Sequence, residues 1–304
     1  MLDWYARNRR ELPWRRDRDP YRVWVSEIML QQTRVAAVLG HYEEFLRRFP
    51  TAEKLAAARE ASVLAAWSGL GYYRRARNMH AAAKIIVRNG GKLPSRSAEW
   101  LLLPGIGRYT AAAIASIASG EAVPVVDGNV ERVLSRVSGF GLAGEEVWRV
   151  AGALLSREQP GDFNQAMMEL GATVCLPERP VCEACPVFKV CATRGGMKKL
   201  RAQTPQRKRE ICYALGRRNG SVFLTQRPKE ASLMPGMWEL PVTEGNGIAL
   251  LTLRHSITVT NYLVRVREAR PPEDVRGRWV HSRQVARLPL TGLTKKILRA
   301  AKII

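Results

Sequence analysis

Hydrophobic positions recur at helical spacing over the first two-thirds of the chain. Apolar side chains return every three or four residues within 35–49, 147–155 and 163–174, a spacing that places them on one face of a helix. Alternation typical of strands is scarce up to residue 197. The pattern therefore predicts a mainly α-helical region over residues 1–197.

The pattern changes after residue 210. Asn219-Gly220 separates two short apolar runs, 211–216 and 222–226, and this dipeptide is typical of the tight turn of a β-hairpin. Further strands are expected over 238–242, 257–266 and 278–280, and a helix over 294–302. These elements predict a small mixed α/β domain over residues 210–304.

A basic segment separates the two regions. Residues 198–209 (KKLRAQTPQRKR) carry six basic side chains, no acidic one and no apolar period. The composition favours a linker along a surface. A solvated run of charge and a phosphate-contacting segment are both compatible with it.

The net charge narrows the class of partner. Lys and Arg number 49 against 27 Asp and Glu, which gives a net charge of +22. A field that positive favours a polyanion such as nucleic acid, or an acidic membrane face. No stretch approaches the roughly 18 apolar residues of a membrane span, and the amino-terminus is too charged for a secretory signal. We therefore expect a cytoplasmic protein associated with the nucleoid.

Four of the five cysteines form a compact motif. Cys175, Cys182, Cys185 and Cys191 follow the spacing C-x6-C-x2-C-x5-C, with no histidine nearby. Four thiolates so close in sequence suit a [4Fe–4S] cluster or a tetrahedral zinc in a reducing compartment. Spacing alone does not choose between the metals, nor between a structural role and a DNA-contacting or redox role. Cys212 lies in an expected strand and is predicted to be a core residue.

A glycine-rich turn lies between two helical patterns. Residues 103–109 read LPGIGRY, and its glycines would let the turn approach another backbone closely. The amino-terminus of the following helix offers free N–H groups and a positive dipole to a phosphate. An ordinary tight turn is the alternative. No strand precedes the turn, which argues against a dinucleotide-binding fold.

Two carboxylates are candidates for catalysis. Glu27 lies among apolar neighbours in VWVSEIML, where burial would raise its pKa and keep it protonated near neutrality. Asp127 precedes an expected helix in VVDGNV. Glycosidic cleavage needs one group that protonates the leaving base and another that stabilises the cationic sugar. The alternatives are an exposed Glu27–Arg pair and a helix N-cap at Asp127.

Six motifs together resemble one enzyme family. They are LPWR (12–15), SEIMLQQTRV (26–35), GLGYYRRARN (69–78), LPGIGRYTAAAI (103–114), VVDGNVERVLSR (125–136) and FNQAMMELGATVC (163–175). This set resembles the MutY family of adenine DNA glycosylases, within the endonuclease III superfamily. The resemblance implies a six-helix barrel with a helix-hairpin-helix, an iron–sulfur helical domain, a [4Fe–4S] cluster on the four cysteines, and a Nudix-like carboxy-terminal domain. It also implies a monomer that binds duplex DNA holding adenine opposite 8-oxoguanine or guanine.

The resemblance also assigns residues to roles. It makes Glu27 the acid that protonates adenine and later handles water, and Asp127 the group that stabilises the sugar cation or a covalent sugar intermediate. The supporting sets are Tyr109 and Asn129 beside these carboxylates, Trp14, Arg15 and Gln165 in the adenine pocket, Gln32 and Tyr72 in the emptied base stack, and Leu103, Gly105, Gly107 and Arg108 on DNA. A core position is the alternative for Tyr72.

Tyr109 predicts base excision without strand cleavage. Relatives of endonuclease III carry a lysine after the same GxGR turn, whose amine attacks the sugar, and tyrosine cannot do this. The tyrosine and the additional domain argue against a bifunctional pyrimidine glycosylase. A non-catalytic iron–sulfur DNA-binding protein is a third alternative, although it would not need both carboxylates.

The carboxy-terminal region departs from the family in two ways. It lacks the acidic Nudix box, so no nucleotide pyrophosphatase activity is expected. The lesion-sensing loop, usually Phe-Ser-His, here reads Ile257-Thr258-Val259. Thr258 retains a hydroxyl, whereas Val259 cannot donate as histidine does, and His255 and Ser256 are neighbours that a shifted register would use. We therefore expect weakened selectivity for 8-oxoguanine over guanine.

Overall fold

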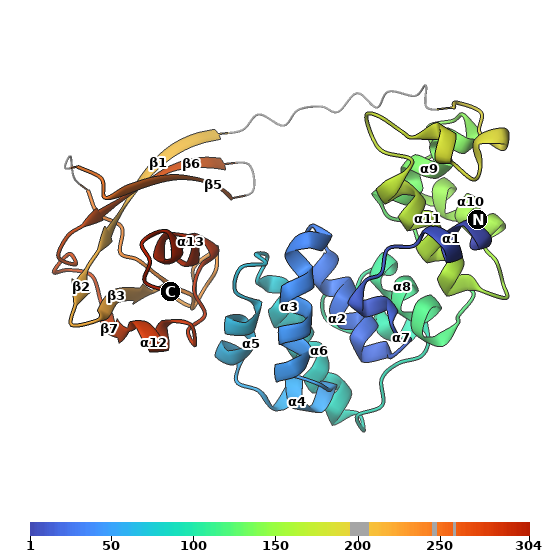
Figure 1. The fold of residues 1–304 in the computed structure, drawn as a ribbon. Helices are drawn as coiled ribbons and strands as arrows, with labels where there is room; N and C mark the ends of the chain where they lie inside the picture. The colour runs from blue at the N-terminus through green and yellow to red at the C-terminus, as the bar shows by residue number, and fades with distance from the viewer. Residues whose placement is uncertain (195–206, 245–247, 258–259) are drawn as a thin grey trace. The chain divides into compact units, whose positions relative to one another are not determined.

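The structure is a computed structural model that describes residues 1–194, 207–244, 248–257 and 260–304 (Figure 1). The chain divides into two compact units, each built from two segments. The first unit joins Met1–Ala56 with Ala81–Arg201, and the second joins Ala57–His80 with Ala202–Ile304.

Helices build the first unit, as the hydrophobic period predicted. Its elements include α1 (Leu2–Asn8), η1 (Pro13–Arg15), α2 (Pro20–Leu30), α3 (Val35–Arg48), α4 (Ala52–Ala57), α7 (Ser97–Trp100), α8 (Arg108–Ser119), α9 (Gly128–Ser138), α10 (Glu145–Leu154), α11 (Pro160–Thr173), η2 (Cys182–Ala184) and η3 (Phe188–Val190). The helix α6 (Arg74–Arg88) runs from the second unit into the first. The helical periods over 35–49, 147–155 and 163–174 correspond to α3, α10 and α11, so these predictions are confirmed.

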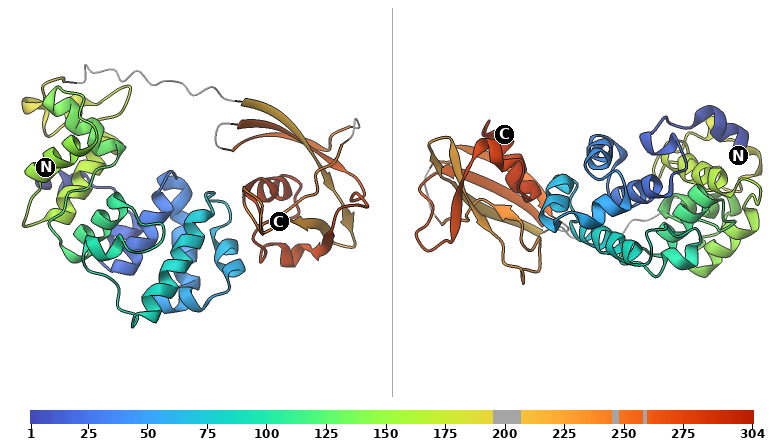
Figure 2. Two further views of the ribbon diagram at one scale, coloured as in Figure 1. Left: turned by 180° about the vertical axis from the view of Figure 1, so that it is seen from behind. Right: turned by 90° about the horizontal axis from the view of Figure 1, so that it is seen from below.

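Local sequence explains where the two central helices begin and how they pack. Asp19 accepts a hydrogen bond from the Arg22 amide, and Pro20 occupies the first position of α2, both typical of a helix start. The alanine run of α8 is fully buried, and its small side chains let α8 contact both α2 and α11. Both views in Figure 2 show α1 beside α11. Two of the predicted catalytic residues lie on these helices, Glu27 on α2 and Tyr109 on α8.

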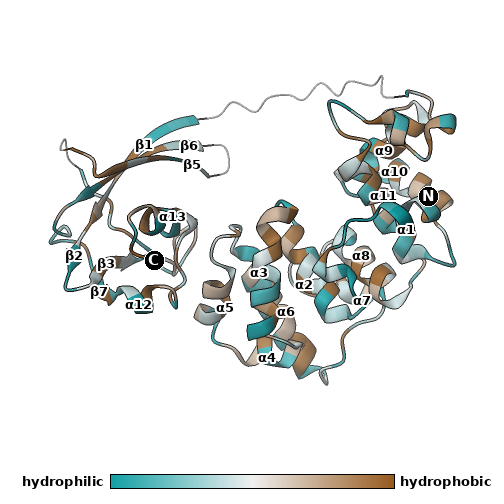
Figure 3. Ribbon diagram, in the orientation of Figure 1, coloured by the Kyte–Doolittle hydropathy of each residue, from teal (hydrophilic) through white to brown (hydrophobic). Residues whose placement is uncertain are grey.

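The second unit holds all the strands that the structure describes. They are β1 (Arg207–Leu215), β2 (Arg217–Arg218), β3 (Ser221–Gln226), β4 (Trp238–Glu239), β5 (Leu251–Ile257), β6 (Thr260–Glu268) and β7 (Gly277–His281), accompanied by α5 (Glu60–Trp67), α12 (Ser282–Val285) and α13 (Gly292–Ala300). One sheet has the order β1-β6-β5, with β1 and β6 parallel; in the other, β3 pairs with β2, β4 and β7. The charged start of β1 is coloured hydrophilic in Figure 3. A core of valines and leucines lies between the sheets and α13.

Three details of the strand prediction are wrong, and so is the predicted core position of Cys212. The turn at Asn219-Gly220 is real, but it joins β2 to β3, because β1 pairs with β6 instead. The expected strand over 257–266 spans the end of β5 and most of β6, which pair antiparallel. The expected strand over 238–242 contracts to β4, and Cys212 is partly exposed instead of buried. Long-range pairing decides these features, and a local pattern does not contain it.

Buried hydroxyls tie the segment Ala57–His80 to the carboxy-terminal part of the second unit. Ser68 Oγ and Tyr73 Oη both donate to the Leu290 carbonyl, at 3.0 and 3.1 Å. Lys295 Nζ donates to the Ser68 carbonyl at 2.6 Å. These bonds hold the loop before α6 against the end of β4 and the start of α13. No helix in the described ranges is long and apolar enough to cross a membrane.

Candidate active site and DNA-binding elements

Glu27 is a buried carboxyl on α2, not a partner in an exposed ion pair. Its side chain accepts a hydrogen bond from Tyr109 Oη at 2.9 Å, and the residue is 6% exposed. Burial raises the pKa of Glu27 to about 7; the Tyr109 hydrogen bond lowers it, and the charge of Asp127 raises it. Near neutrality, therefore, a large share of Glu27 carries a proton that it can donate.

Asp127 lies at the amino-terminus of α9. Its Oδ1 accepts from the amides of Asn129 and Val130, at 2.9 and 2.8 Å, and its Oδ2 accepts from Asn129 Nδ2 at 2.9 Å. The residue is thus the N-cap that its sequence position indicated. The same three donors fix the orientation of the carboxylate, so capping and an electrostatic role are compatible.

Tyr109 is a buried phenol that donates to Glu27 and lies within the electrostatic influence of Asp127. Burial and the charges of Glu27 and Asp127 raise the pKa of Tyr109 well above its usual value, so the phenol stays a neutral donor. It also contacts Met168 Sδ at 3.4 Å. The site therefore offers a proton donor with a pKa near 7, a neutral hydroxyl bonded to it, and a partly exposed carboxylate at Asp127.

A buried carboxylate that sequence reasoning missed, Glu169, binds Arg15 of the predicted adenine pocket. Glu169 is 1% exposed and accepts from Arg15 Nη2 at 2.9 Å and from Arg10 Nε and Nη2 at 2.7 Å each. Desolvation raises the pKa of Glu169, but the hydrogen bonds from both arginines outweigh it and leave the pKa at about 2. Trp14 is buried against Tyr42, with ring centroids 5.3 Å apart.

Gln165 is half-buried on α11, the helix that carries Glu169. The signal that identified Glu27, an acidic residue inside an apolar helical pattern, would have found Glu169 in FNQAMMELG.

Arg132 is a second residue that sequence reasoning missed. Its guanidinium donates to Asn129 Oδ1 at 2.8 Å, to the Gly171 carbonyl at 2.6 Å and to the Cys175 carbonyl at 2.8 Å. It therefore fixes Asn129, which in turn holds Asp127, against the start of the cysteine-rich segment. Its spacing of three residues from Asn129 on one helix is the only local hint.

The glycine-rich turn precedes a helix, as expected. Gly105 has a φ of +77°, and Gly107 is the N-cap of α8 without any side-chain cap. Nothing lies within 4 Å of a Cβ built at Gly107, so the first amides of α8 are open to a phosphate. Leu103 is buried beneath the turn.

Arg108 and Gln32 are exposed near these elements. Arg108 pairs with Glu145 and lies over the Trp148 ring, with its Cζ 4.0 Å from the centroid. Gln32 follows α2 with a φ of +55°, a left-handed conformation that is unusual outside glycine. Both side chains therefore lie where DNA could reach them.

Tyr72 is not a core residue. It is 50% exposed, with a φ of +50°, and it lines a cavity of about 540 Å³ in the second unit. His255, Ser256 and Ile257 line the same cavity. The structure thus brings the predicted base-stack residue together with the start of the predicted lesion-sensing loop. Thr258 and Val259 lie outside the described residues.

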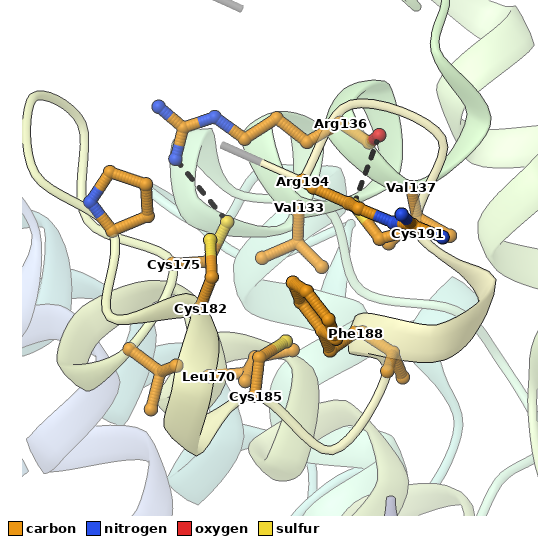
Figure 4. Close-up of a pocket in the computed structure, with 13 residues that line it drawn as sticks. Val133, Arg136, Val137, Leu170, Cys175, Cys182, Cys185, Phe188, Cys191 and Arg194 are labelled. Carbon is orange, nitrogen blue, oxygen red and sulfur yellow. Dashed lines mark hydrogen bonds between the residues drawn. The ribbon is translucent and has the colours of Figure 1, made fainter. Parts of the chain in front are cut away.

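The four predicted metal ligands surround one pocket. Figure 4 shows Cys175, Cys182, Cys185 and Cys191 around it, with α9 as one wall. Burial raises the pKa of the Cys185 thiol, and the other three thiols raise it further. Within the described ranges, however, no three His, Cys, Asp or Glu side chains are placed closely enough together to hold one metal ion.

A buried arginine connects this pocket to α9. Arg136 is 4% exposed and donates to Cys175 Sγ at 3.4 Å and to the Leu176 and Pro177 carbonyls at 2.7 Å each. Its own carbonyl accepts from Thr193 Oγ1 at 3.0 Å. Its positive charge would stabilise thiolates, the form that binds metal. By residue type, four thiols beside a buried arginine suit a thiolate-ligated group.

Sequence comparisons relate this chain to DNA repair proteins. The pattern of the HhH-GPD superfamily of base excision DNA repair proteins matches residues 25–145. The adenine DNA glycosylase of Homo sapiens is 50% identical over 211 residues, which cover 64% of this chain and 38% of the human protein. That of Arabidopsis thaliana is 38% identical over 291 residues, or 79% of this chain and 46% of the plant protein. The chain spans less than half the length of these two relatives.

Solved structures share the helical fold. A thermostable thymine-DNA glycosylase matches with a TM-score of 0.61 and 30% identity, covering 64% of this chain and 94% of that chain. A non-covalent endonuclease III–DNA complex matches with a TM-score of 0.56 and 23% identity over 64% and 92%. The predicted fold class is confirmed: a largely helical fold like that of endonuclease III, followed by a small strand-containing region consistent with a Nudix-like domain.

Proposed function

The chain belongs to the HhH-GPD superfamily of base excision DNA repair proteins, and we propose that it is a DNA glycosylase that hydrolyses the N-glycosidic bond of adenine opposite 8-oxoguanine or guanine. The observation that carries this proposal is the buried Glu27, with a pKa of about 7, bonded to Tyr109 and influenced by Asp127. Identity of 50% to the human adenine DNA glycosylase supports the choice of base.

The two carboxyl groups divide the chemistry. Protonated Glu27 donates its proton to the leaving adenine, which takes the electron pair of the bond to the sugar. The positive charge that develops on the sugar is stabilised by the Asp127 carboxylate, held by three donors. Water then adds to the sugar carbon, and the Glu27 carboxylate takes up the proton that this water loses.

Strand cleavage is not part of the proposed reaction. Schiff-base formation requires an amine that attacks the sugar, and the position after the GxGR turn holds Tyr109. We propose that Tyr109 instead keeps Glu27 oriented by its 2.9 Å hydrogen bond. The product is then an intact strand with an abasic site.

Access to adenine requires that the nucleotide leave the duplex. The exposure of Gln32 and Tyr72 supports their assignment to the emptied stack. Trp14, Arg15 and Gln165 would line the adenine pocket, with Glu169 holding Arg15. The open amides at the start of α8 would bind the DNA backbone without reading its sequence.

We also propose that the four cysteines hold a [4Fe–4S] cluster. The convergence of the four side chains on one pocket and the buried Arg136 beside Cys175 support a thiolate-bound group. When bound, the cluster would cross-link the segment 175–191 to itself. Arg136 would then hold that segment against α9, the helix capped by Asp127. Iron and sulfide analysis distinguishes the cluster from zinc.

Recognition of the opposite base is assigned to the second unit. The cavity that contains Tyr72, His255 and Ser256 supports a lesion-reading role. Ile257 stands where the family usually has phenylalanine, and Thr258 and Val259 follow it. We propose that selectivity for 8-oxoguanine over guanine is weaker than in an ordinary member of the family. Equal selectivity, or no loss of it in Thr258→Ala, would refute this.

A duplex assay tests the whole proposal. Purified protein is incubated with duplexes holding one adenine opposite 8-oxoguanine or guanine, then treated with alkali to cleave abasic sites. We expect the native protein to act as a monomer and to produce alkali-dependent cleavage. We expect no cleavage with Asp127→Asn, a variant that retains a side-chain oxygen that can cap α9. Cleavage without alkali would favour a bifunctional glycosylase. Tight binding without excision would favour a non-catalytic DNA-binding protein of the cytoplasm or nucleoid.

A further inference from the structure

The loop that carries Tyr72 has an unusual backbone. Gly69, Gly71 and Tyr72 have φ values of +112°, +72° and +50°. Glycine adopts such angles freely, whereas a tyrosine in the left-handed region is strained and persists only where its surroundings hold it. Contacts with surrounding residues must therefore hold the backbone of the loop in this conformation.

Two side chains bind the loop at the same carbonyl. Trp67 Nε1 donates to the Gly71 carbonyl at 3.1 Å, and Arg75 Nη2 donates to it at 3.3 Å. The Arg75 amide also donates to the Tyr72 carbonyl at 2.9 Å. The backbone is thus held at the peptide bonds immediately before and after Tyr72.

The guanidinium of Arg75 also lies between two aromatic rings. Its Cζ is 5.5 Å from the centroid of the Trp67 ring and 5.3 Å from that of the Tyr72 ring. Both distances allow cation–π attraction. Burial lowers the pKa of Arg75 to about 10, so the group still carries its charge near neutrality.

We propose that Arg75 is a positioning residue for the insertion of Tyr72 into the DNA stack. Arg75 contacts the Tyr72 ring, while half of the Tyr72 side chain remains exposed to stack on a base. A planar guanidinium can stack on rings and donate to a carbonyl at once, which the compact ammonium of lysine cannot do. This inference rests on the proposed function, because it deepens the role assigned to Tyr72.

A double-mutant cycle tests this inference. Single-turnover excision of adenine is measured for the native protein, Arg75→Met, Tyr72→Ala and the double variant. In parallel, a 2-aminopurine beside the target adenine reports unstacking by its fluorescence. We expect Arg75→Met to slow excision and reduce unstacking about ten-fold. In the Tyr72→Ala background, the same substitution should change neither quantity further, because Arg75 acts through Tyr72.

Two further variants control for charge and folding. Arg88→Met removes an equal charge from an exposed position in the last turn of α6, away from the cavity that Tyr72 lines, and we expect almost no loss. Arg75→Lys keeps the charge and should be nearly as slow as Arg75→Met, which keeps the test available if the methionine variant does not fold. The inference is overturned if lysine restores the native rate, if Arg88→Met loses as much, or if Arg75→Met slows both backgrounds equally.

The two proposals fail in distinguishable ways. If the native protein excises no adenine, the proposed function fails, and the 2-aminopurine signal still tests Arg75 because it requires no chemistry. If the native protein excises adenine but Arg75→Met equals it in rate and in unstacking, the inference about Arg75 alone is wrong.

Discussion

Tyr109→Phe removes a single hydroxyl from the proposed active site and leaves the ring in place. That hydroxyl donates to Glu27 at 2.9 Å and lowers the pKa of Glu27, which burial has raised to about 7. A hydrogen bond to a charged group is worth about 1.5–3 kcal/mol, and one pKa unit corresponds to about 1.4 kcal/mol. Loss of the bond should therefore raise the pKa of Glu27 by about one to two units.

The consequence is a shift in the pH dependence of excision. Glu27 acts in its protonated form, so the rate of the native protein should fall as the pH rises through about 7. In Tyr109→Phe this fall should move to higher pH by about one to two units. Single-turnover rates on one duplex across neutral and alkaline pH measure both profiles.

A matched control comes from α2 itself. Tyr21→Phe removes another buried hydroxyl, which donates to the Phe49 carbonyl at 2.8 Å, and it should leave the pH profile unchanged. A profile of Tyr109→Phe that stays in place, or moves to lower pH, would show that Tyr109 does not stabilise the Glu27 carboxylate.

Three further predictions follow from the same contacts. Glu169→Gln removes the buried negative charge that Arg10 and Arg15 bind, and it should lower the free energy of unfolding by about 2–3 kcal/mol in urea denaturation. Because the pKa of Glu169 is about 2 in the folded state, the native protein should lose this contribution as the pH falls from about 4.5 towards 2. Arg136→Met removes the guanidinium beside Cys175 and should lower the iron content of purified protein, whereas unchanged iron would contradict its role. Borohydride should trap no covalent complex with DNA, since no lysine follows the GxGR turn, and efficient trapping would indicate a bifunctional enzyme.

The helical region was predictable because its signals are local. An apolar period marks α3 and α11. Aspartates are the N-caps of α2 and α9, and a proline begins α2 and α11. Each of these signals lies within a single stretch of sequence. The strands were less predictable, since β1 pairs with β6, which lies far along the chain, and no Gly or Pro interrupts the apolar run over 257–266. The sequence therefore predicted whether a segment is a helix or a strand better than it predicted which strands pair.

The candidate site shows the same division. The burial of Glu27 follows from its apolar neighbours, but its partner Tyr109 lies 82 residues away and came only from the family resemblance. Tyr72 fits a core position by composition, but in the structure it is exposed on a loop with a left-handed backbone. Glu169 carries the same local signal as Glu27, but its arginine partners lie far away in the sequence. Arg132 has only its spacing from Asn129 as a local signal, and its other partners are backbone carbonyls. The roles of these residues remain predictions.

Release of free adenine tests the central claim most directly. A duplex with adenine opposite 8-oxoguanine is incubated in excess of the native protein, Glu27→Gln or Asp127→Asn, and the released base is quantified by mass spectrometry. We predict one adenine released per duplex by the native protein and a large loss of rate in both variants, with DNA binding retained. Release of another base, or full activity without Glu27 or Asp127, would contradict it.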